Sequence, residues 1–199
     1  MRALVLVLLF LAPPLLADDV TDWIDEGRKA WLAGKGDEAI QHLETASQMI
    51  RQAKGERLEQ ALPEAPAGWK RTDAGSSALG GAYFGGMTGA NASYERQQGE
   101  EFHTCSISIA TDSPMMSMLL MSFANPMMLS ASGQKLVKVG DQKASMEYDE
   151  ENKSGTLHMV VEQKVLVTVE GSGLSADELK AFAATVKVDV IRKVLAGQS

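Results

Sequence analysis

The spacing of apolar residues changes along this chain, and that change limits the folds available to it. Between residues 39 and 53 apolar side chains recur every three or four positions, the period of a helix with one buried stripe. From residue 91 onward they alternate with polar residues, the period of a strand with one buried face. Helices followed by alternating strands predict an α+β fold. We expect an N-terminal αα-hairpin and then a twisted antiparallel sheet covered by helices.

Proline and glycine divide the chain into predicted segments. Two helices joined by a glycine-containing turn make a hairpin over residues 18–62, which Pro63 closes. Residues 63–90 are rich in Pro, Gly, Ser and Ala, so we expect a linker followed by a loop or a short small-residue helix. The α+β domain then occupies residues 91–199.

Three signals place elements inside the α+β domain. Ser113 precedes a proline and a methionine-rich stretch, which predicts a capped helix there. Ser175 and Glu178 have the spacing of a capping box, which predicts one closing helix that ends at Gly197. Between these helices, alternation predicts strands over residues 135–139, 144–149, 157–162 and 165–170.

The first 17 residues have the order of a secretory signal peptide. Arg2 supplies a positive charge, an apolar run covers residues 3–12, and Ala17 ends the segment with the small residue that signal peptidases require. The run is shorter than the roughly 20 residues that span a bilayer. We therefore predict cleavage after Ala17, a periplasmic location, and no membrane span after cleavage.

The charge balance excludes one class of partner. All 26 acidic residues but only 18 of the 19 basic residues follow residue 17, so the mature chain carries a formal net charge of −8. Nucleic acid requires a basic patch because its phosphates are negative. We therefore expect no nucleic-acid partner.

Six residues of the hairpin lie at the small and aromatic positions of a tetratricopeptide repeat: Trp23, Gly27, Gly34, Ala39, Leu43 and Ala46. The segment resembles one such repeat of about 34 residues, although Glu26 and Ala30 stand where the family has larger apolar residues. Arrays need about three repeats to bury a continuous core. The resemblance therefore implies a single TPR-like hairpin, and another kind of packed two-helix hairpin fits the pattern equally well.

The order of the later segments resembles a second family. Leu62-Pro63 and Gly68-Trp69 open the region, and a hairpin, a helix, a meander of strands and a long closing helix follow. This order is similar to that of the PsbP-type α/β/α sandwich over about 130 residues. PsbP-like proteins are mostly exported or lumenal accessory subunits without catalysis. The resemblance implies such a role and assigns no site residue.

The residues that could catalyse a reaction are few. Alternation places His103 and Cys105 on one strand face with Ile107 and Ile109, so this face is expected to be core rather than a Cys–His nucleophile pair. No Gly-x-Ser-x-Gly elbow or phosphate-binding loop is present. We therefore predict no enzymatic site.

Methionine is the one compositional anomaly. Six of the 11 methionines lie between residues 115 and 128. Thioethers suit Cu(I), and Met115, Met118 and Met121 would share a helix side, with His103 and His158 as possible further ligands. Methionine also fills apolar cores and forms adaptable binding surfaces. We favour core or interface and expect no cofactor, with copper as the alternative.

These observations predict a non-enzymatic periplasmic accessory protein. It would bind another exported or membrane-complex protein through the helical hairpin and the Met-rich helix. The expected contact residues are Trp23, Trp31, Met116, Met127 and Met128. A periplasmic Cu(I)-binding protein and a hydrolase with a site assembled from distant residues are the two alternatives.

Overall fold

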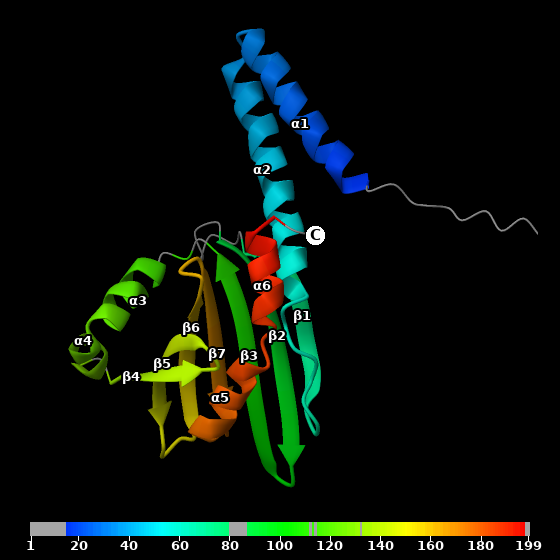
Figure 1. Cartoon of the computed structure of the whole chain (residues 1–199). Helices are drawn as coiled ribbons and strands as arrows, with labels where there is room; N and C mark the ends of the chain where they lie inside the picture. The colour runs from blue at the N-terminus through cyan, green and yellow to red at the C-terminus, as the bar shows by residue number, and fades with distance from the viewer. Residues whose placement is uncertain (1–14, 80–86, 112, 114, 132, 198–199) are drawn as a thin grey trace, which may run out of the picture. The chain divides into compact units, whose positions relative to one another are not determined.

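A computed structural model describes residues 15–79, 87–111, 113, 115–131 and 133–197. The chain divides into two compact units, residues 1–50 and 51–199. Helices come first, and an antiparallel sheet with further helices follows (Figure 1). The predicted α+β class is confirmed. The apolar run of the predicted signal peptide lies outside the described residues.

Helix α1 (Leu15–Leu32) and the first part of α2 (Gly36–Glu59) form the first unit. Small residues make the contact between the two helices, because the buried positions here are Gly27, Ala30, Ala39 and Ala46. A Cβ atom on Gly27 would come within 2.9 Å of Leu43 Cγ, so glycine allows this close approach. Leu43 therefore packs against Gly27, whereas Trp31 and Leu32 are largely exposed.

In the described part of the second unit, seven strands form one antiparallel sheet with the order β1-β2-β3-β7-β6-β5-β4. Chain neighbours pair throughout, except that β3 lies beside β7. The strands are β1 (Lys70–Leu79), β2 (Met87–Gln98), β3 (Glu101–Thr111), β4 (Lys135–Val139), β5 (Gln142–Asp149), β6 (Ser154–Val161) and β7 (Val165–Ser172).

One face of the sheet forms the main core. Helices α5 (Ala176–Ala184) and α6 (Val188–Leu195) pack on it together with the end of α2. The alternation predicted for β3 is confirmed, since Cys105, Ile107 and Ile109 are buried in this core.

The opposite face carries a smaller apolar cluster at one end. Helix α3 (Met115–Ala124) places Leu119 on Val160 of β6 and Leu166 of β7, and α4 (Pro126–Ala131) follows it. Most of the other described side chains on this face are polar, and Phe102 and Leu136 are exposed apolar exceptions. No helix in the described residues is long and apolar enough to cross a membrane.

A group of aromatic residues joins the linker to the sheet and α5. Phe182 of α5 contacts the Trp69 ring edge-on, with ring centroids 4.7 Å apart, and lies 5.6 Å from the Tyr94 ring. The Tyr94 hydroxyl donates a 2.7 Å hydrogen bond to the Pro63 carbonyl. The linker is therefore part of the packed unit.

The structure differs from the sequence prediction for residues 75–90. Residues up to 79 belong to β1 and residues from 87 to β2, so both ends of the predicted loop are strands. Close backbone approach favours small residues here, because a Cβ atom on Gly89 would overlap the carbonyl oxygen of Ile109. Residues 80–86 lie outside the described residues.

The predicted single C-terminal helix is also divided in two. The capping box of Ser175 and Glu178 is present and starts α5 as predicted. Helix α5 ends at Ala184, and α6 begins at Val188. The Lys187 backbone N–H donates to the Ala61 carbonyl at 3.0 Å, so a tertiary hydrogen bond holds the break.

Candidate functional site

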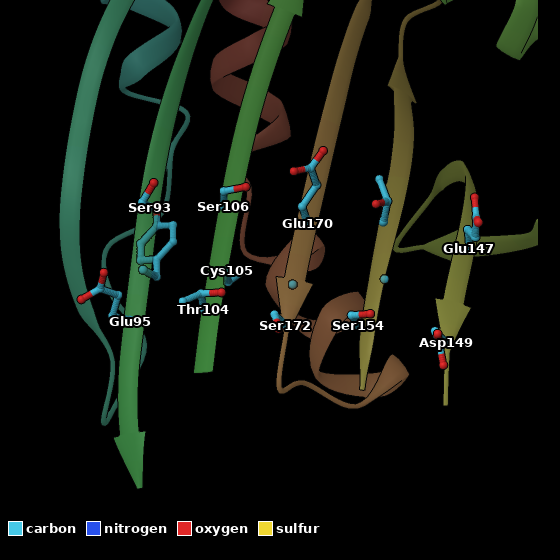
Figure 2. A pocket seen from close by; sticks show the side chains of 14 residues that line it. Ser93, Glu95, Thr104, Cys105, Ser106, Glu147, Asp149, Ser154, Glu170 and Ser172 are labelled. Carbon is cyan, nitrogen blue, oxygen red and sulfur yellow. The ribbon is translucent and has the colours of Figure 1, made fainter. Parts of the chain in front are cut away.

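The polar part of the sheet forms an open groove of about 680 Å³ (Figure 2). Strand register sets its side chains in two neighbouring cross-strand rows. One row is Glu147, Thr156, Glu170, Ser106 and Ser93, and the next is Asp149, Ser154, Ser172, Thr104 and Glu95. The groove thus presents hydroxyls and carboxylates side by side on adjacent strands.

The groove is acidic. Its lining includes four carboxylates, Glu95, Glu147, Asp149 and Glu170, and no Lys, Arg or His. Asp149 also closes the following turn, because its carboxylate accepts a 2.7 Å hydrogen bond from the Asn152 side chain and further bonds from backbone N–H groups. These hydrogen bonds lower the pKa of Asp149, and the bond from the Asn152 side chain has the largest effect. The groove can accept hydrogen bonds from a cationic, donor-rich group.

His158 lies one row further along the same face. Its Nδ1 is 3.1 Å from the Thr168 hydroxyl. Burial lowers the pKa of His158, and the charges of Glu170 and Glu147 oppose that effect. A hydrolase would need a nucleophile, a base and a group that orients the base. Among the described residues the hydrogen bond of the His158 ring is that to Thr168, which by itself does not form such a set.

The Cys105 thiol lies on the other face, inside the main core. Its residue is 2% exposed, and burial raises its pKa to about 12. His103 forms no hydrogen bond with it, because Nδ1 lies 2.6 Å from the Gly173 carbonyl oxygen and must donate to it, and Nε2 has no hydrogen-bond partner among the described residues. The expectation that this strand face is core is confirmed.

The exposed methionines lie on the outer side of α3 and on α4. The exposed fractions are 46% for Met115, 68% for Met118, 65% for Met121 and 81% for Met127. Met116 is half-buried and packs on the cluster under α3. The Met128 side chain lies outside the described residues. Core filling is therefore wrong for the four exposed methionines, while a surface role remains as predicted.

The structure does not gather the copper ligands that the alternative requires. His103 lies near the start of β3, where its Nδ1 donates a hydrogen bond to the Gly173 carbonyl oxygen. His158 lies on the sheet face, whereas Met118 and Met121 are on the side of α3 opposite to packed Leu119. Among the described residues, no group of three or more His, Cys, Asp or Glu side chains could hold a metal ion.

We expect no tight one-to-one Cu(I) complex, because the imidazoles and the exposed thioethers are apart. A Met115→Leu, Met118→Leu, Met121→Leu variant nearly conserves volume, so its unfolding free energy should stay within about 1.5 kcal/mol of the parent. Titration with Cu(I) against a competing chelator measures the affinity. A tight stoichiometric complex that the triple variant loses would establish the copper alternative.

The predicted contact residues of the hairpin lie at its surface. Trp31 is 69% exposed, and Trp23 is 37% exposed with its ring 5.3 Å from that of His42. Leu32, at 76% exposed, extends the surface and was not predicted. Its signal in the sequence was its place beside Trp31 at the end of the first helix.

Comparison of the chain with protein-family models, curated proteins and solved structures found no match. The resemblances to a tetratricopeptide repeat and to PsbP-like proteins therefore stay predictions from the sequence.

Proposed function

We propose that this chain is a non-enzymatic periplasmic accessory protein that binds another protein through its helical hairpin. The observation that carries the proposal is the apolar surface that the hairpin leaves exposed. Small side chains are buried between its helices, whereas Trp31 and Leu32 are largely exposed. The signal-peptide order of residues 1–17 supports the location.

The exposed apolar surface continues onto the second helix. Ile40, Leu43 and Ile50 are 56%, 47% and 50% exposed, at steps of three and seven residues. Single exposed apolar residues are ordinary, but clustered ones mark interaction sites. An isolated hairpin also lacks the neighbouring repeats that would cover this surface in an array. A partner protein would supply that cover, and tryptophan is among the residues enriched at binding hot spots.

Changing Trp31→Ala and Leu32→Ala together should abolish partner capture while the fold persists. Removal of two apolar side chains from an interface centre costs about 2–4 kcal/mol, which weakens binding by at least about thirtyfold. The measurement is crosslinking in cells followed by identification of the co-purified protein. Alanine suits an exposed helix position, so circular dichroism should be unchanged.

The matched control is Phe102→Ala, which removes another exposed apolar side chain, 57% exposed, from the second unit. It should leave capture intact. Equal capture by the parent and the hairpin variant would overturn the proposal.

The sequence predicts the Met-rich helix as a second contact element.

A further inference from the structure

Helices α3 and α4 lie in the longest uncharged part of the mature chain. Residues 113–134 contain no Asp, Glu, Lys, Arg or His. Leu119, Leu120 and Phe123 hold the inner side of α3 on the sheet. The outer side exposes Met115, Met118 and Met121, and α4 exposes Met127. We call these four side chains the methionine surface. It is uncharged and apolar, yet it faces solvent.

Lysines lie on the sheet face that α3 covers, beside the contact between α3 and the sheet. Lys138 pairs with Lys143, and continuing the β5–β6 register by one residue places Lys143 beside Val160, on which α3 rests. Adjacent strands are about 4.8 Å apart, so both lysines lie within roughly 10 Å of that contact along the backbone. Lys164, in the turn after β6, lies at the same end. All three lysines are exposed, and within the described residues no ion pair engages them.

Three described carboxylates at this end of the sheet share one arginine. Arg192 contacts Glu162 at 2.8 Å, Asp141 at 3.0 Å and Asp189 at 3.2 Å. These are the acids of the two turns at this end of the sheet and of the first turn of α6. The three lysines and Arg192 carry four positive charges against the three negative ones, so these seven side chains keep a net charge of +1, although the mature chain is acidic as a whole.

We propose that the methionine surface and its lysines dock onto an anionic lipid bilayer. Unbranched thioether side chains would enter the boundary between headgroups and acyl chains, where no polar partner is needed. The ammonium groups of Lys138, Lys143 and Lys164 would meet lipid phosphates, and each basic residue near an anionic membrane strengthens binding about fivefold.

The composition of the surface favours lipid over a protein partner. Methionine is enriched in protein–protein interfaces together with aromatic residues and arginine, whereas lysine is depleted there. The lysines, and not the methionines, therefore favour lipid over a protein partner. The methionine surface and its three lysines include no aromatic ring and no arginine. Apolar insertion beside lysines is the pattern of proteins that lie on membranes. This site is independent of the hairpin surface.

The test is flotation of the protein as purified from cells with vesicles of phosphatidylglycerol and phosphatidylcholine, and with vesicles of phosphatidylcholine alone. We expect binding to the anionic vesicles that weakens with added salt. Met118→Asp with Met121→Asp should reduce it at least about tenfold, as should Lys138→Glu with Lys143→Glu. Met118→Leu with Met121→Leu should bind like the parent, because it keeps the apolar surface.

Matched controls place the same changes elsewhere. Lys70→Glu with Lys153→Glu makes the same charge change at exposed positions in β1 and in the turn between β5 and β6, away from α3, and Phe102→Asp adds an acid at another exposed apolar position. Both should retain binding. All variants have the same N-terminal segment as the parent. A difference in vesicle binding between them therefore comes from the α3–α4 region. Circular dichroism shows that each variant folds.

Three results would overturn the proposal. The first is absence of binding to anionic vesicles. The second is equal binding by the parent and both α3–α4 variants, which would place lipid contact elsewhere in the chain. The third is loss of a co-purified protein in the Met118→Asp, Met121→Asp variant without any vesicle binding by the parent, which would assign the surface to a protein. None of these results depends on the hairpin test.

Discussion

Replacement of Phe182 by alanine should destabilise the second unit by about 3–5 kcal/mol, the range for removing a large buried aromatic side chain. Phe182 is 5% exposed and contacts both Trp69 and Tyr94. The cavity would open between α5, the linker and the sheet. The free energy of unfolding in urea gives the measurement, and the thermal midpoint should fall by roughly 10 °C.

The comparison is Phe102→Ala, which deletes the same atoms from a side chain that is 57% exposed. Its stability should remain within about 0.5 kcal/mol of the parent. Arg96 stacks over Trp69 at 4.8 Å and forms a 3.1 Å ion pair with Glu178 of α5, so partial support of the tryptophan survives the Phe182 change. Equal unfolding free energies for the two variants would show that the aromatic contact does not hold α5 on the sheet.

Local patterns predicted the elements whose partners are near in sequence. Alternation placed Cys105 and Ile107 on the buried face, and the capping box of Ser175 and Glu178 marked the start of α5. Such signals depend on one strand face or one helix turn. Each of these signals lies within one short segment of the sequence and does not depend on the rest of the fold.

Tertiary contacts decided the elements that the patterns missed. Small residues in 75–90 have low strand propensity. Residues 75–79 and 87–90 nevertheless pair as strands, with Gly89 opposite Ala110 in β3. The C-terminal helix breaks where Lys187 bonds to Ala61, more than a hundred residues earlier in the chain. Neither contact leaves a periodic signal.

The groove could be predicted only in part. Alternation already put Thr104 and Ser106 on the polar side of β3. The order of the strands, which places Glu170 of β7 beside Ser106, comes from the pairing of β3 with a strand about sixty residues later. The exposure of Met118 was likewise undecided, because the same spacing fits a core helix and a surface helix.

Raising the pH above 9 should destabilise the second unit steeply. Burial raises the pKa of Cys105 from 9.0 to about 12 and that of Tyr94 from 10.0 to about 12. In the unfolded chain both groups ionise at their ordinary values, so the unfolded state loses protons first. The stability that these neutral groups contribute is complete below pH 9 and is lost as the pH rises toward 12. Each group costs about 1.4 kcal/mol per pH unit between its two pKa values, which is about 4 kcal/mol for Cys105 and about 3 kcal/mol for Tyr94, or about 7 kcal/mol in total by pH 12.

Two variants isolate this effect from the titration of surface lysines. Cys105→Ala removes the thiol, and Tyr94→Phe removes the phenolic hydroxyl together with its 2.7 Å hydrogen bond to the Pro63 carbonyl. Both variants should be less stable than the parent at pH 7, yet their stability should fall less between pH 9 and pH 12. The measurement is the unfolding free energy in urea at intervals across that range. A double variant whose stability declines as steeply as that of the parent would show that the thiol and the phenol are not the groups whose ionisation unfolds the core.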